Sequence, residues 1–305
     1  MPLYRDFNAY LRETFGCRVQ KITLDAGMTC PNRDGHLARG GCIYCNTRGS
    51  GTGAAETHSI TAQIQAAKSR LAKRYKAKKF LAYFQSFSNT YAPLPVLQRM
   101  YAEALADQDV LGLSIGTRPD CLPKDVLEHL EQLGRERLIW LELGLQSARE
   151  ATLHFINRGH TAVQFREALT RSRAHGLPVC AHVILGLPGE SRDDMLHTAR
   201  FLAESGVEGV KIHLLYVIRG TRLHDLYRQG RYTCLEQREY ACLVGEFLSL
   251  LPESTIIQRL TGDPHREELV APEWALHKNT TLEMIQACMR ENNLSQGSRL
   301  YAPVF

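Results

Sequence analysis

Three cysteines share one glycine-rich loop, at Cys30, Cys42 and Cys45. The Cys-x2-Cys pair places two thiolates on one tight turn, and Cys30 adds a third sulfur with no obvious fourth ligand. A structural zinc ion normally has four ligands, and the remaining candidates lack zinc-finger spacing: Cys17, His36 and His58. Three thiolates on one loop suit a [4Fe–4S] cluster with one iron left open, unlike the four-cysteine clusters of ferredoxins. A zinc site is the alternative.

The cysteine loop follows the first of six strand-like segments, at 18–24, 80–84, 110–115, 138–143, 179–185 and 210–217. Helical stretches lie between these segments, near 59–76, 94–108, 124–133, 161–175 and 191–205. A short strand at 255–258 and a helix near 273–293 follow. Strands that alternate with helices predict a parallel sheet.

The expected strands have one apolar face and one polar or small face. Side chains alternate between the faces of a strand, so in ELGLQS the leucines share one face, whereas Glu142, Gly144 and Gln146 share the other. Lys211 and His213 likewise lie opposite apolar neighbours. A closed eight-stranded barrel is filled with branched apolar side chains. Six strands with a polar inner face therefore predict an α/β fold, a partial (β/α)6 TIM-type barrel that is open on one side. An antiparallel sheet with one wet face is the alternative, against which the helix-length connections argue.

The composition is that of an ordinary globular protein, with 44% hydrophobic and 23% charged residues among 305, which excludes disorder and coiled coil as the main state. No apolar run approaches the ~18 residues of a membrane helix, and the first residues lack a secretory-signal pattern. We therefore expect a cytoplasmic protein with no membrane partner, in which disulfides are rare. The other cysteines are then expected to fill the core singly: Cys121, Cys180, Cys234, Cys242 and Cys288.

The cysteine loop and the expected barrel together resemble the radical S-adenosylmethionine (SAM) superfamily. The long first spacing resembles the branch with the catalytic subunit of Elongator, and CPNRDG…GGCIYC is closer to the YhcC/YtqA branch. The likeness continues through YFQSFSNTYAP, IGTRPDCL, ELGLQS, HVILGLPGE, KIHLLYVIRGTRL and QRLTGD. It implies that Cys30, Cys42 and Cys45 each hold one iron and that SAM binds the fourth. One electron from the cluster then cleaves SAM, and the resulting 5′-deoxyadenosyl radical abstracts hydrogen from a substrate.

The resemblance also implies the residues that bind SAM. They follow the strand ends: Gln85, Ser86, Ser88 and Asn89 after the second strand, Thr117 and Arg118 after the third, Glu142, Gln146 and Arg158 on and after the fourth, and His182 and Gly186 on and after the fifth. Four alternatives to these roles stay open. The residues after the second strand form only a polar turn, Arg118 pairs with Asp120, Glu142 pairs with Lys211, and His182 is only a satisfied core group. The residues expected to contact substrate are Lys211, His213, Arg219, Arg259 and Asp263.

The motifs divide the chain into a radical core at 1–220, with the cluster loop at 25–56, and a C-terminal extension at 221–305 that packs on the core. Seven of the twelve residues at 68–79 are basic, which is typical of a solvated helix face or of a patch that binds phosphates. The Elongator-like kinship favours tRNA as partner, with chemistry on the carbon-5 side chain of a wobble uridine such as carboxymethylaminomethyl-uridine. A reductase, flavodoxin or ferredoxin would donate the electron. The alternatives are a small-metabolite substrate and a noncatalytic, zinc-stabilised RNA-binding protein.

Overall fold

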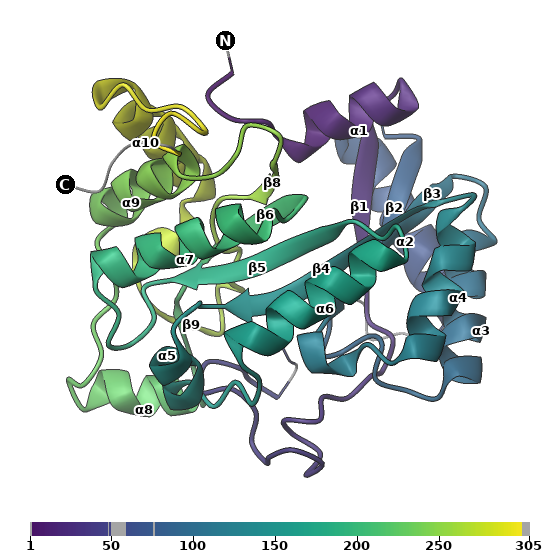
Figure 1. Ribbon diagram of the computed structural model, residues 1–305, viewed down its shortest axis with the longest axis horizontal. Helices are drawn as coiled ribbons and strands as arrows, with labels where there is room; N and C mark the ends of the chain where they lie inside the picture. Colours follow the sequence, from purple (N-terminus) through teal and green to yellow (C-terminus); the bar gives the residue numbers. More distant parts are fainter. Residues whose placement is uncertain (1, 48, 50–58, 76, 301–305) are drawn as a thin grey trace.

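The computed structural model describes residues 2–47, 49, 59–75 and 77–300 (Figure 1). Seven parallel strands form one sheet in the order β1-β2-β3-β4-β5-β6-β8. Their bounds are Val19–Leu24, Lys79–Phe84, Val110–Thr117, Leu138–Gln146, Val179–Leu185, Gly209–Leu214 and, for β8, Ile256–Arg259. The curled sheet confirms the partial barrel. The expected number of six strands was wrong, because the short segment near 255–258 joins the sheet beside β6.

Helices between successive strands cover the outer face of the sheet (Figure 1). They are α2 (Ile60–Tyr75), α3 (Leu94–Leu105), α4 (Lys124–Gly134), α6 (Ala162–Ala174) and α7 (Arg192–Ser205). Leu141, Leu143 and Leu145 of β4 are fully buried in the core on this side. A capping box of Ser191 and Asp194 begins α7, since the two side chains satisfy backbone N–H groups that have no partner within the helix. The burial of the three β4 leucines on the helix-covered side confirms the predicted alternation of faces.

Several elements were not expected from the sequence. Four helices were missed: α1 (Phe7–Phe15), α5 (Glu150–Phe155), α8 (Arg222–Arg228) and α9 (Gln237–Ser249). The strand predicted at 210–217 was wrong at its end, because β6 stops at Leu214 and β7 (Val217–Ile218) pairs with β9 (Leu269–Ala271) in a separate antiparallel sheet. The helix predicted at 273–293 is α10 (Lys278–Glu291), which follows the 3-10 turn η2 (Glu273–Leu276). A second such turn, η1 (Pro119–Cys121), follows β3.

Helix α1 closes the amino end of the barrel. Phe7 and Leu11 pack against Trp140, and the Phe7 and Trp140 rings meet edge to face with centroids 6.0 Å apart. Leu81, Cys180 and Ile256, which lie near the starts of other strands, complete this apolar floor. Figure 1 shows α1 and the loop after β1 at opposite ends of the sheet. The lumen is therefore apolar at one end, and its polar side chains lie toward the carboxyl ends of the strands.

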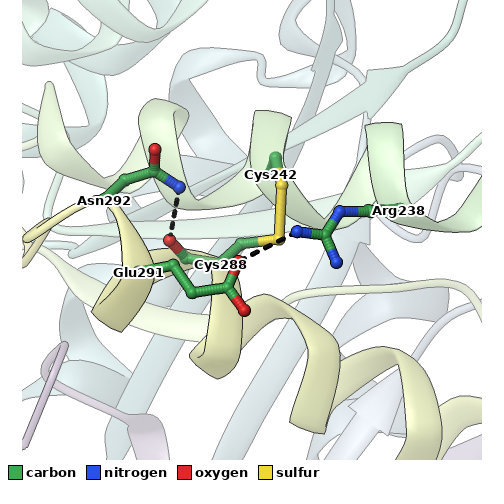
Figure 2. Close-up of a disulfide and its surroundings, with 5 residues drawn as sticks. All are labelled: Arg238, Cys242, Cys288, Glu291 and Asn292. Atoms are coloured by element: carbon green, nitrogen blue, oxygen red, sulfur yellow. Dashed lines mark hydrogen bonds and ion pairs between the residues drawn. A yellow bond between two sulfur atoms is a disulfide. The ribbon is translucent and has the colours of Figure 1, made fainter.

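The C-terminal helices are joined by a disulfide between Cys242 of α9 and Cys288 of α10 (Figure 2). This pairing corrects the expectation that both cysteines fill the core singly, whereas Cys121 and Cys180 are buried free thiols as expected. Arg238 and Glu291 form an ion pair of 3.0 Å across the same two helices. No helix in the described part of the chain combines the length and apolarity needed to cross a bilayer.

Reduction of the disulfide is expected to lower the free energy of unfolding by roughly 3–4 kcal/mol, because the bond closes a loop of 46 residues in the unfolded chain. Guanidinium unfolding with and without dithiothreitol measures the change. A Cys242→Ala/Cys288→Ala double variant is the control, and reductant should not shift its midpoint. Equal midpoints for the wild-type protein in both conditions would contradict the pairing.

Candidate functional site

The carboxyl ends of the strands surround a cavity of about 320 Å³. Most of the predicted site residues line it: Cys30, Cys42, Cys45, Gln85, Ser88, Thr117, Arg118, Glu142, Gln146, Arg158, His182, His213, Arg259 and Asp263. Five other predicted residues, all within the described ranges, do not line it: Ser86, Asn89, Gly186, Lys211 and Arg219. Residues from distant parts of the sequence thus meet in one cavity, as the positions of the strand ends predicted.

The three loop cysteines are free thiols on the wall of this cavity. The backbone N–H of Cys45 donates to the carbonyl of Cys42 at 3.0 Å, which forms the expected tight turn. Burial, reinforced by the nearby Cys42 and Cys30 thiols, raises the pKa of Cys45 to about 12. Among the described residues, no three His, Cys, Asp or Glu side chains converge on one point as a single metal ion requires. A [4Fe–4S] cluster needs no such point, because each cysteine binds a different iron.

Nitrogen donors surround the cysteine sulfurs. Arg33 Nη1 donates to Cys45 Sγ at 3.4 Å, and Asn32 Nδ2 and Arg158 Nη1 donate to Cys42 Sγ at 3.7 and 3.8 Å. Hydrogen bonds and positive charge at ligand sulfurs stabilise thiolates and tune the potential of a cluster. The donor set therefore fits an anionic iron–sulfur cluster. Asn32 and Arg33 were not predicted as site residues, although they lie directly after Cys30 in CPNRDG.

Gly144, Gln146 and Arg158 form a cradle beside Cys42. Arg158 Nη2 donates to the carbonyl of Gly144 at 2.8 Å, while its Nε is buried without a partner in the described part of the chain. Gln146 has a left-handed backbone with φ of 76°, a strained conformation that is concentrated at functional sites. A Cβ atom at Gly144 would collide with the guanidinium of Arg158 and the amide of Gln146. The glycine thus makes room for two polar groups, and Arg158 retains a donor for a ligand.

Glu142 lies at the centre of a buried group of charges, here called the Glu142 cluster: Lys21, Glu142, His182 and Lys211. Both lysines form ion pairs with its carboxylate, and His182 Nε2 lies 2.7 Å from it. Burial alone would raise the pKa of Glu142, but the two lysines and His182 outweigh it and hold the pKa well below its usual value. Glu142 therefore has its own partners within the protein, including the pairing with Lys211 that the sequence left open.

The basic groups beside Glu142 are shifted toward their neutral forms. Burial lowers the pKa of Lys211 to about 7, against the opposing effect of Glu142. Burial and the charge of Lys211 lower the pKa of His182 to about 4. His213 lies next to His182, with ring centroids 5.3 Å apart, and burial followed by the charge of Arg259 holds its pKa well below the usual value. Both histidines are therefore neutral at pH 7.

Acidification from pH 7 to pH 5 is expected to destabilise the protein through these two histidines. In the unfolded chain they bind protons near pH 6.5, whereas the folded chain keeps them neutral to a lower pH. The unfolded state then binds more protons, so at pH 5 His182 lowers the free energy of unfolding by about 2 kcal/mol, and His213 lowers it further. Guanidinium unfolding at the two pH values measures the fall.

Two variants test this pH dependence. His213→Gln removes a buried histidine, and His154→Gln is the control, because His154 is exposed on α5. His213→Gln should reduce the fall in the free energy of unfolding, and His154→Gln should leave the fall unchanged. The same fall in both variants would contradict the assignment of His213 as a buried neutral group.

The polar residues after β2 and β3 mostly bond to one another. Arg118 donates to both carboxylate oxygens of Asp120, at 2.9 and 2.8 Å, and to the carbonyl of Arg158 at 2.8 Å. Asn89 Nδ2 donates to the carbonyl of Gly116 at 2.9 Å. Thr117 shares a hydrogen bond of 2.6 Å with the hydroxyl of Thr90. Arg118 thus has the alternative pairing that the sequence allowed, and it positions the backbone next to Arg158.

Other cavity residues were not predicted either, among them Phe87, Tyr216 and His265. Phe87 has a positive φ of 62°, and the guanidinium of Arg33 lies 5.7 Å from its ring centroid. The Phe87 ring thus lies beside Arg33, the arginine that donates a hydrogen bond to the sulfur of Cys45. The nearest signal in the sequence was its position between Ser86 and Ser88.

The remaining candidates lie elsewhere or outside the described residues. Cys17 precedes β1 whereas the cysteine loop follows it, so the two lie at opposite ends of the strand. His36 does not line the cavity, and His58 lies outside the described residues. In the basic run at 68–79, Lys68 of α2 pairs with Asp107 and Asp109, and Lys79 of β2 pairs with Asp109. Arg70 of the same run lines the cavity. The side chains at 72–76 are also outside the described part.

Known proteins are similar to this chain in sequence and in fold. The pattern of the Radical SAM superfamily matches residues 32–202, and that of the Radical_SAM C-terminal domain matches 207–291. The uncharacterized protein YtqA of Bacillus subtilis is 42% identical over 295 residues, which are 96% of this chain and 92% of YtqA. These matches confirm the predicted resemblance, while the predicted division at residue 220 stays a prediction.

Two more distant proteins are similar over a smaller share of their own length. The tRNA uridine(34) acetyltransferase of Dehalococcoides mccartyi is 30% identical over 161 residues, which are 52% of this chain and 34% of that protein. The structure of Elp3 from Methanocaldococcus infernus superposes with a TM-score of 0.70 at 18% identity and covers 91% of this chain and 64% of that one. The second comparison shows a common fold.

Proposed function

The chain belongs to the radical S-adenosylmethionine superfamily, and on that premise we propose that it acts on tRNA, at the carbon-5 side chain of a wobble uridine. It is an enzyme whose cofactors are a [4Fe–4S] cluster and SAM. The proposed reaction processes a carboxymethylaminomethyl group. The observation that carries the proposal is the similarity of half the chain to a protein named for uridine 34 of tRNA.

In this proposal Cys30, Cys42 and Cys45 hold the cluster. Arg33 donates a hydrogen bond to the sulfur of Cys45, and Asn32 and Arg158 donate hydrogen bonds to the sulfur of Cys42. When bound, the cluster supplies the electron that cleaves SAM and generates the radical that abstracts a substrate hydrogen. Arg158 has a buried Nε without a partner among the described residues. We assign this arginine to the carboxylate of SAM, because a guanidinium suits a planar anion. The apolar floor of Phe7, Leu11 and Trp140 excludes water from the amino end of the lumen.

The remaining site assignments are proposals of the same kind. Gln85, Ser88, Thr117, Gln146 and His182 line the cavity where SAM would lie. Ser86, Asn89, Arg118, Glu142 and Gly186 would act on SAM through their neighbours. We also place the protein in the cytoplasm, with a reductase, flavodoxin or ferredoxin as electron donor.

The nucleosides of tRNA from a strain that lacks the gene test this function. Mass spectrometry should show accumulation of carboxymethylaminomethyl-uridine and loss of the nucleosides made from it. The wild-type gene should restore the profile, and a Cys42→Ala gene should not. An unchanged profile would contradict the proposal. Formation of 5′-deoxyadenosine with a metabolite fraction, but not with tRNA, would instead support a small-molecule substrate.

A further inference from the structure

The cavity wall formed by β6 and β8 has hydrogen-bond donors without acceptors. Arg259, the last residue of β8, pairs with Lys211 through its backbone and lines the cavity, whereas its guanidinium has no hydrogen-bond or ion-pair partner among the described residues. His213 of β6 also lines the cavity, and its buried Nε2 has no partner in the described part of the chain. Gln258 Nε2 beside Arg259 is likewise buried and unpartnered. Buried donors of this kind are costly to leave unpaired.

This wall also has an excess of positive charge. Glu142 is the acidic group of its cluster, and it already faces Lys21 and Lys211. Asp263 lines the cavity too, but its Oδ2 accepts from Lys278 at 3.2 Å. Among the residues that the structure describes, the Arg259 guanidinium therefore has no carboxylate partner. A partly buried cation without a counter-ion is unfavourable, so the wall is suited to an anionic ligand.

We propose that Arg259 and His213 form a binding site for a carboxylate of the substrate, at the end of its uridine side chain. The inference rests on the proposed function, and it adds the feature by which the substrate would be recognised. The planar fork of Arg259 donates two parallel hydrogen bonds to a carboxylate, and the unpartnered His213 Nε2 offers a further contact. The phosphates of tRNA lie on its backbone, whereas a carboxylate on the base side chain enters the lumen with the base.

The test is equilibrium binding of tRNA to the cluster-loaded enzyme under anaerobic conditions, without reductant. The probes are two tRNAs that differ only at the wobble uridine, one with a carboxymethylaminomethyl side chain and one with an aminomethyl side chain. The wild-type protein should bind the carboxylate form about tenfold to a hundredfold more tightly. Arg259→Gln should bring this ratio close to one, and Arg259→Lys, which keeps the charge without the fork, should give an intermediate ratio.

Two controls separate the site from folding and from the cofactor. Arg135→Gln removes an exposed arginine just after α4 that pairs with Glu131, and the ratio of the two tRNA affinities should stay at its wild-type value. The affinity for SAM, measured by equilibrium dialysis, should be unchanged in Arg259→Gln, as should its iron content. Loss of SAM affinity with an unchanged tRNA ratio would assign Arg259 to the carboxylate of the cofactor and overturn the inference.

The remaining outcomes distinguish this inference from the function on which it rests. A wild-type preference that survives in Arg259→Gln overturns the inference and leaves the proposed function intact. Equal wild-type affinity for both tRNAs overturns the inference as well, and the nucleoside profile then decides the function. No affinity for either tRNA contradicts the proposed function, and the inference falls with it.

Discussion

Cys42→Ala is expected to remove the iron–sulfur cluster, from about four irons and four sulfides per chain to nearly none. Formation of 5′-deoxyadenosine should stop with it, because the remaining two thiolates cannot hold the cluster. The fold should persist, since the neighbouring backbone has its own partners. Ile43 N–H donates to the carbonyl of Ile156 at 3.1 Å, and Leu223 N–H donates to the carbonyl of Ile43 at 2.8 Å. Iron and sulfide analysis after anaerobic reconstitution, with circular dichroism, measures both effects.

Cys17→Ala is the matched control for this experiment. Cys17 is an exposed free thiol before β1, so its loss should change neither iron content nor 5′-deoxyadenosine formation. Full iron and activity in Cys42→Ala would show that the ligand assignment is wrong. One zinc per chain in the wild-type protein, with no iron, would favour a zinc-stabilised RNA-binding protein.

Glu142→Gln is expected to lower the free energy of unfolding by about 3–5 kcal/mol. The Glu142 side chain is fully buried and forms ion pairs with both Lys21 and Lys211. The neutral amide leaves two lysines close together in the lumen without a counter-charge. Chemical denaturation at pH 7 measures the loss, and the iron content shows whether the mouth of the barrel is affected.

Glu128→Gln is the matched control, because Glu128 is half exposed and pairs with Lys124 at 3.4 Å on the surface of α4. An exposed pair of this kind contributes under about 1 kcal/mol. Adding Lys211→Met to Glu142→Gln should recover part of the loss, since it removes one of the unpaired charges. A loss in Glu142→Gln no larger than in Glu128→Gln would refute the central role of this carboxylate.

Much of the barrel was predictable because the alternation of faces is a local property of each strand. The buried leucines of β4 and the lumen-facing Glu142, Lys211 and His213 follow from parity alone. The membership of β8 in the sheet did not follow, because four residues carry no signal for a partner strand as distant as β6. Helix α9 was missed although the sequence carries its signal, since Tyr240, Val244, Phe247 and Leu248 recur at the spacing of an amphipathic helix.

The site residues whose chemistry follows from their type could be predicted from the sequence. Those whose position depends on the backbone conformation could not. The three cysteines are recognisable by type and spacing. The position of Phe87 depends on a left-handed backbone, which the sequence does not reveal for a phenylalanine. The pairing of Cys242 with Cys288 depends on how α9 and α10 pack, and nothing in their spacing indicates contact.

The closed amino end of the barrel determines how the protein responds to ionic strength. Mobile ions screen only the charges that they can approach, and in 1 M salt they screen exposed charges beyond about 3 Å. Surface pairs such as Lys124 with Glu128 are weakened under such conditions. The ion pairs of Glu142 lie between the floor of Phe7 and Trp140 and the cavity, and the buried Glu142 carboxylate makes them less sensitive to dissolved salt than surface pairs. In concentrated salt the interior of the barrel therefore keeps more of its electrostatic stabilisation than the surface does, while attraction between the protein surface and a polyanion weakens.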